Sequence, residues 1–132
     1  MINVHPKTCN LCGGPVEFAS NAIIYGRQYG SGYCYHCTRC GAYVGTHRPW
    51  PDRAMGILAD EEMRAWKMIC HELFDALWKP TGNHRLRRQL YSRLAVQMGI
   101  EVDDCHFGYF DLEALKKAYQ IVSAWSIDDS GN

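Results

Sequence analysis

The sequence predicts an α+β protein in which a small N-terminal zinc ribbon precedes a module of three helices. Five of the seven cysteines fall between Cys9 and Cys40, among short β-prone runs, whereas helical periodicity begins only near Asp60. Residues 1–7 lack the pattern of a secretory signal, so metal binding is a better expectation for these cysteines than disulfides. We expect the ribbon over residues 1–57 and the helical module over 58–132, folding as one unit.

Three short strands are predicted in the ribbon, at residues 15–20, 22–25 and 33–36. Each is rich in β-branched or aromatic residues, and Asn21 and the glycine-rich stretch 26–32 separate them. They should form a small antiparallel sheet.

The three helices are predicted from periodicity and from their end signals. The first begins at Asp60, its N-cap, carries apolar residues at spacings of three and four, and stops at residues 79–82. The second runs over residues 84–98 and ends at Gly99. The third follows from Asp111.

The strongest functional signal is a pair of Cys-x-x-Cys motifs, each followed by glycine. They comprise Cys9, Cys12, Cys37 and Cys40. Structural Zn²⁺ takes four tetrahedral thiolates, and a glycine after the second cysteine permits the positive φ that such a turn needs. The sequence therefore predicts one structural zinc ion, whose binding would also fold the ribbon.

Two other residues could change the ligand set. Cys34 and Cys37 are also separated by two residues, and His36 lies close enough to replace a thiolate. Cys70 and Cys105 lie on or beside helices and are predicted to be core thiols. A zinc ion with four thiolates has a charge of −2, so Lys7, Arg39 and Arg27 are expected to help neutralise it.

Several stretches resemble a family of phage and bacterial zinc-finger-containing proteins. They are residues 37–40, 42–47, 56–59, 71, 74–75, 77–78, 91, 94–95, 99–100 and 105–111. The resemblance covers nearly the whole chain and implies a zinc site on the two cysteine pairs in a small, often phage-encoded protein, with no known activity. One departure is the turn at residues 48–51, where the family pattern is expected to be richer in glycine and small residues.

The surface predicts binding of a macromolecule, either nucleic acid or a host protein, without favouring one. Tyrosines and arginines alternate in the ribbon, and the second helix is rich in arginine. These arginines could instead pair with the acidic C-terminal region. The candidate contact residues are Arg27, Tyr29, Tyr35, Arg39, Arg48, Trp50, Arg85 and Arg88. For the protein-docking alternative, an adaptor or inhibitor of a host enzyme, the proline-flanked Trp50 is the expected anchor.

An enzymatic alternative uses three histidines. His47, His71 and His106 have carboxylates nearby and could serve a small metal-dependent hydrolase or nuclease. No phosphate loop, paired metalloprotease histidines or serine elbow is present, so no catalytic residue and no small-molecule substrate are indicated. No apolar run is long enough for a membrane span, and we expect a cytoplasmic protein, in the host cytoplasm if it is phage-encoded.

Overall fold

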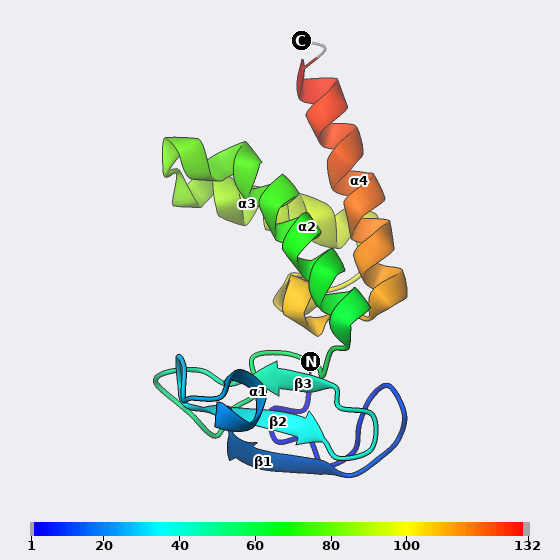
Figure 1. Ribbon diagram of the computed structural model, residues 1–132. Helices are drawn as coiled ribbons and strands as arrows, with labels where there is room; N and C mark the ends of the chain where they lie inside the picture. Colours follow the sequence, from blue (N-terminus) through cyan, green and yellow to red (C-terminus); the bar gives the residue numbers. More distant parts are fainter. Residues whose placement is uncertain (1, 131–132) are drawn as a thin grey trace. The chain divides into compact units, whose positions relative to one another are not determined.

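The computed structural model describes residues 2–130, with side chains through Trp125. It divides into two compact units, Ile2–Glu62 and the chain from Met63 onward. We call them the ribbon unit and the helical unit. The first contains a small antiparallel sheet and the second is helical, which confirms the predicted α+β class (Figure 1).

The sheet has three antiparallel strands, β1 (Val16–Ser20), β2 (Tyr33–Cys37) and β3 (Tyr43–Gly45), with β2 in the middle (Figure 1). In the register, Val16 faces Cys37 and Tyr35 faces Val44. Because side chains alternate along a strand, these four residues share one face of the sheet. That face packs on the core of the ribbon unit, which also includes Cys9, Ala42, Ala54 and Leu58.

The segment predicted as a second strand is instead a helical turn, α1 (Ala22–Tyr25). The carbonyl of Asn21 accepts hydrogen bonds from the N–H groups of Ile24 and Tyr25, and Gly26 ends the turn with a φ of 79°. Strands β1 and β2 pair directly with each other, so the connection between them has to reverse the chain rather than add a strand. Local hydrogen bonds therefore prevail over the β propensity of this short run.

Strand β3 was not predicted from the sequence. It has only three residues, one of them Gly45, so it offers almost no periodicity. Tertiary pairing defines it, because Tyr35 and His36 of β2 face Val44 and Tyr43. Tyr43 pairs with His36 of β2 on one side and forms an isolated antiparallel bridge with Ala59 on the other.

The three predicted helices are present as α2 (Glu61–Trp78), α3 (His84–Met98) and α4 (Leu112–Ser130). Glycine ends α3 as expected, since Gly99 has a φ of 73° and its N–H donates to the carbonyls of Ala95 and Val96. The carboxylate of Asp111 accepts a hydrogen bond from the N–H of Ala114 at 2.9 Å and so caps α4.

Aromatic side chains dominate the core of the helical unit. Phe74 of α2 is fully buried, and its ring lies 4.3 Å from that of Tyr91 and 5.6 Å from that of Phe107. Short 3₁₀ turns, η1 (Lys79–Thr81), η2 (Val102–Asp104) and η3 (Phe107–Tyr109), connect the long helices. Within the described residues, no helix combines the length and apolar character needed to cross a membrane.

Candidate metal centre

The two Cys-x-x-Cys segments fold into matching turns. The N–H of Gly13 donates to the carbonyl of Cys9, and the N–H of Gly41 donates to that of Cys37, each at 3.0 Å. The cysteine that opens each turn also donates its own N–H, Cys9 to Gly14 at 2.9 Å and Cys37 to Ala42 at 2.8 Å. The repeated spacing in the sequence therefore corresponds to a repeated backbone structure.

Both glycines that follow the second cysteine adopt the predicted backbone conformation. Gly13 has a φ of 75° and Gly41 a φ of 82°, a region that L side chains rarely occupy. The turns also direct backbone N–H groups at sulfur, from Leu11 to Cys9 at 3.3 Å and from Arg39 to Cys37 at 3.4 Å. Such donors stabilise thiolates.

The four sulfur atoms of Cys9, Cys12, Cys37 and Cys40 all lie within 4.8 Å of one another. Two of the sulfur pairs are Cys12 with Cys37 at 3.5 Å and Cys9 with Cys40 at 3.7 Å. A Zn–S bond of about 2.3 Å gives a tetrahedron with edges of roughly 3.8 Å, so this cluster has the dimensions of a zinc site.

Gly14 is packed tightly against this cluster. A Cβ atom at Gly14 would lie 3.1 Å from the sulfurs of Cys12 and Cys37 and 2.8 Å from the Cβ of Arg39. The absence of a side chain here lets the two turns approach each other closely. Glycine at this position thus keeps the metal site compact, whereas Gly13 and Gly41 serve the backbone conformation of the turns.

The electrostatic environment favours a thiolate at Cys37 and a protonated thiol at Cys40. Hydrogen bonds to the Cys37 sulfur, first from the N–H of Cys40 and then from that of Arg39, lower the pKa of Cys37 to about 6. Desolvation acts in the opposite direction but does not outweigh them. The N–H of Ala42 lowers the pKa of Cys40, but desolvation and the neighbouring sulfurs outweigh it and raise that pKa to about 12. The guanidinium of Arg39 donates to the carbonyl of Cys12 at 3.3 Å, which places a positive charge beside both turns. This position suits the predicted neutralising role of Arg39.

Neither alternative ligand belongs to the cluster of four sulfurs. Cys34 is fully buried and lies three residues before Cys37 on β2, so its side chain projects from the opposite face of the sheet. His36 lies on that opposite face too, between Glu17 and Tyr43. Its Nδ1 is buried with no hydrogen-bond partner among the described residues.

The two remaining cysteines lie in the core of the helical unit, as predicted. Cys70 and Cys105 are 2% and 1% exposed, and burial raises the pKa of each to about 11. The thiol of Cys70 donates to the carbonyl of Leu115. Both groups therefore stay protonated near neutral pH.

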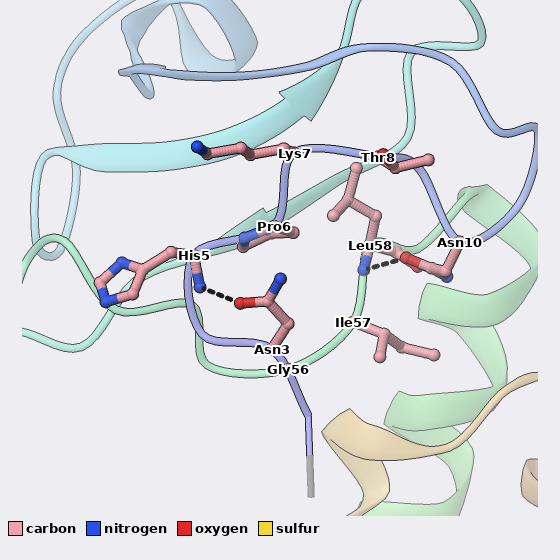
Figure 2. A pocket seen from close by; sticks show the side chains of 9 residues that line it. All are labelled: Asn3, His5, Pro6, Lys7, Thr8, Asn10, Gly56, Ile57 and Leu58. Carbon is pink, nitrogen blue, oxygen red and sulfur yellow. Dashed lines mark hydrogen bonds between the residues drawn. The ribbon is translucent and has the colours of Figure 1, made fainter.

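A residue inside the first cysteine turn fastens it to a distant segment. The side-chain oxygen of Asn10 accepts from the N–H of Leu58, and its amide nitrogen donates to the carbonyl of Leu58, both at 2.9 Å (Figure 2 shows the first contact). Asn10 belongs to the wall of a cavity of about 380 Å³ that Asn3, His5 and Leu58 also line (Figure 2). Nothing in the spacing of the motif reveals this role of Asn10.

Three of the polar side chains that line this cavity, those of Asn3, His5 and Asn10, have hydrogen-bond partners within the ribbon unit. Asn3 accepts a hydrogen bond from the N–H of His5, and the His5 ring bonds to the hydroxyl of Tyr35 at 3.2 Å (Figure 2 shows the first contact). The His5 bond holds the N-terminal segment against β2, and the Asn10 bonds hold the first cysteine turn against Leu58. These three side chains of the cavity therefore help to hold the fold of the ribbon unit together.

The aromatic residues of the ribbon unit fall into two groups. Tyr35, a predicted contact residue, is only 6% exposed and its hydroxyl donates to the carbonyl of Asp52, so it is part of the core. Tyr29, by contrast, is 65% exposed, and Trp50 is 55% exposed. Alternation of aromatic and basic residues in the sequence does not distinguish these positions, because core and surface rings occur in the same short stretch.

The predicted basic contacts are exposed. These residues are Arg27, Arg39, Arg48, Arg85 and Arg88. Two further arginines of α3 are held on aromatic rings, Arg87 over Trp78 and Tyr91 and Arg93 over Trp125 at 4.4 Å. Part of the basic character of α3 therefore stabilises the helical unit through cation–π contacts.

Each of the three histidines of the enzymatic alternative lies against an aromatic ring. The ring of His47 lies against Trp50 in the ribbon unit, whereas His71 packs on Phe107 and His106 on Tyr109 in the helical unit. Within either unit of the described chain, the four cysteines are the only group of three or more His, Cys, Asp or Glu side chains that could hold a metal ion.

Taken together, the fold and the four-cysteine site define a small α+β zinc-binding protein. The chain belongs to the zinc-finger-containing domain family, which matches residues 5–125. Family and geometry confirm the prediction of one structural zinc ion, which these four cysteines would hold. No curated protein and no solved structure matches the chain.

Proposed function

We propose that this chain is a zinc-stabilised protein that binds single-stranded nucleic acid through exposed tyrosines of the ribbon unit. The observation that carries the proposal is the exposure of Tyr25 and Tyr29, at 54% and 65%, next to exposed Arg27 and Arg48. Unpaired bases stack on aromatic rings and arginines bind the backbone phosphates, a combination that suits single strands.

The segment that carries these rings, residues 25–32, is held in one conformation; we call it the tyrosine loop. Asn21 is 6% exposed, and its side chain binds both backbone groups of Tyr29, donating to the carbonyl at 2.6 Å and accepting from the N–H at 3.0 Å. The Tyr25 and Tyr29 rings lie 5.9 Å apart with an interplanar angle of 56°. A base would therefore meet rings whose backbone is already ordered, which reduces the entropic cost of binding.

A hollow beside the tyrosine loop provides room for a nucleotide. Its volume is about 500 Å³, and residues 28–32 and Arg48 line it. A phosphate near Arg48 would place the attached base within reach of the Tyr29 ring. The hydroxyls of Ser31 and Thr46 bond to each other at the base of the loop, which adds to its rigidity.

Charge sets the expected strength of binding. The whole chain has equal numbers of basic and acidic residues, so affinity should come from stacking and from a few local arginine contacts. With roughly two or three phosphates contacted, the slope of log K against log salt for a single strand should be about −1.4 to −2.1.

The proposal is tested by fluorescence anisotropy with a labelled oligothymidylate at low and moderate salt. Tyr29→Ala should weaken binding by about 5- to 150-fold, the equivalent of the roughly 1–3 kcal/mol that one stacked base contributes. Tyr29→Phe keeps the ring and should bind like the unaltered protein. Absence of binding at low salt, or equal affinity for Tyr29→Ala, would contradict the proposal.

Docking on a protein is the second candidate, and the exposure of Trp50 favours it. The guanidinium of Arg53 lies 5.5 Å from the centre of the Trp50 ring, so the ring is steadied although 55% exposed. Ordered aromatic side chains of this kind often anchor interfaces. The expectation of a phage-encoded adaptor belongs with this candidate, whose partner would be a host protein.

A further inference from the structure

The helical unit contains a further cavity, lined by basic and aromatic side chains and separate in sequence from the zinc site and from the tyrosine loop. Its volume is about 370 Å³. Residues 87, 88, 91 and 92 of α3 line one side, and residues 102, 103, 105 and 106, in and after η2, line the other. We call it the α3 cavity.

Positive charge gathers on the α3 side of this cavity. Arg87 and Arg88 both line it, and α3 has no acidic residue along its length. Consecutive helix residues project in different directions, but both of these arginines line the same cavity and so can present N–H donors to it. Guanidinium groups match phosphate oxygens in geometry. Asp103 also lines the cavity and is the one carboxylate among its lining residues, so the basic groups prevail there.

The arginine nearest the core is already ordered. The Arg87 guanidinium lies 5.5 Å from the centre of the Trp78 ring and 4.9 Å from that of Tyr91. Arg87 also hydrogen-bonds the side chain of Tyr91, and the remaining N–H donors of its five are available to an acceptor. The side-chain entropy of Arg87 is thus lost on folding rather than on ligand binding.

Aromatic, apolar and hydroxyl side chains complete the walls. Tyr91 and His106 both line the cavity, their ring centres 6.3 Å apart, and Val102 adds an apolar surface that is 47% exposed. Ser92 adds a hydroxyl on the α3 side. Aromatic walls beside paired arginines suit a ligand that joins a phosphate to an organic group.

From this arrangement we infer that the α3 cavity is a binding site for a small phosphate monoester, with Arg87 and Arg88 binding the phosphate and Tyr91 and His106 contacting the organic part. The site goes beyond the proposed function, because all of its residues belong to the helical unit and none to the tyrosine loop. Each proposal can therefore fail without the other.

The test uses the whole 132-residue chain loaded with zinc, and isothermal titration calorimetry measures its binding of phenyl phosphate, the probe. Binding should be saturable and tighter than that of inorganic phosphate, which lacks the ring, or benzoate, which lacks the phosphate. Arg88→Gln should weaken phenyl phosphate binding about tenfold, the usual effect of losing one charge-assisted contact. Arg85→Gln is the matched control, since Arg85 is an exposed arginine of the same helix that does not line the cavity.

A second readout locates the ligand. The NMR signals of the His106 ring should shift along the same binding curve, whereas those of His47 in the ribbon unit should not. Tyr29→Ala should leave phenyl phosphate binding unchanged, which separates this site from the proposed nucleic-acid surface. Non-saturable binding, an equal loss in Arg85→Gln and Arg88→Gln, or an unshifted His106 would overturn the inference.

Discussion

Single residues decide how closely the two cysteine turns approach each other. Gly13 and Gly41 provide the left-handed backbone that each turn requires, whereas Gly14 is needed because a side chain would collide with its neighbours. The first role can be predicted from the position of glycine after each motif. The second depends on Arg39, which lies 25 residues further along the chain and meets Gly14 only in the folded structure.

Replacement of Gly14 by Ala should therefore weaken the metal site. The new Cβ would lie 2.8 Å from the Cβ of Arg39, a backbone-anchored atom that cannot move away alone. We expect the free energy of unfolding to fall by about 1–3 kcal/mol, which is typical of overpacking. Zinc should also pass more quickly to a chelator, and a colorimetric zinc indicator measures this release. Gly45→Ala is the control, since its Cβ would meet only the Met55 sulfur at 3.9 Å. Equal release rates for the two variants would count against the packing role of Gly14.

At the scale of secondary structure, the helices could be predicted from the sequence more completely than the sheet. Helix α3 has the predicted bounds, because its apolar period and the terminal Gly99 are local signals. Strand β3 and the helical turn α1 could not be predicted in this way, since tertiary pairing and the reversal between β1 and β2 determine them. The burial of Tyr35 and the exposure of Tyr29 likewise depend on the sheet face and the loop that carry them.

Helix α2 offers a direct test of the core of the helical unit. Phe74→Ala should lower the free energy of unfolding by about 3–5 kcal/mol, because the fully buried ring contacts Tyr91 and Phe107. Met68→Ala, on the same helix at a residue 65% exposed, should change it by less than about 0.5 kcal/mol. Urea unfolding followed by far-ultraviolet circular dichroism measures both. Similar losses of unfolding free energy in the two variants would show that Phe74 does not belong to the core of the helical unit.

At the scale of the whole molecule, different interactions stabilise the two units. The core of the ribbon unit is small and includes Cys9 and Cys37, so much of its stability must come from the metal. Structural zinc contributes on the order of 10–16 kcal/mol in small finger peptides, far more than such a core could supply. The helical unit instead buries large side chains such as Phe74, Phe107 and Trp125. Removal of zinc should therefore unfold the sheet, as expected for a structural metal ion.

The most direct test of this account is native mass spectrometry of the unaltered protein and of two cysteine variants. We predict one zinc ion in the unaltered protein, none in Cys37→Ser, and one in Cys34→Ser, because Cys34 projects from the opposite face of β2. The β-sheet signals in the NMR spectrum should disappear with the zinc. Retention of zinc by Cys37→Ser, or its loss from Cys34→Ser, would contradict the assignment of the metal to Cys9, Cys12, Cys37 and Cys40.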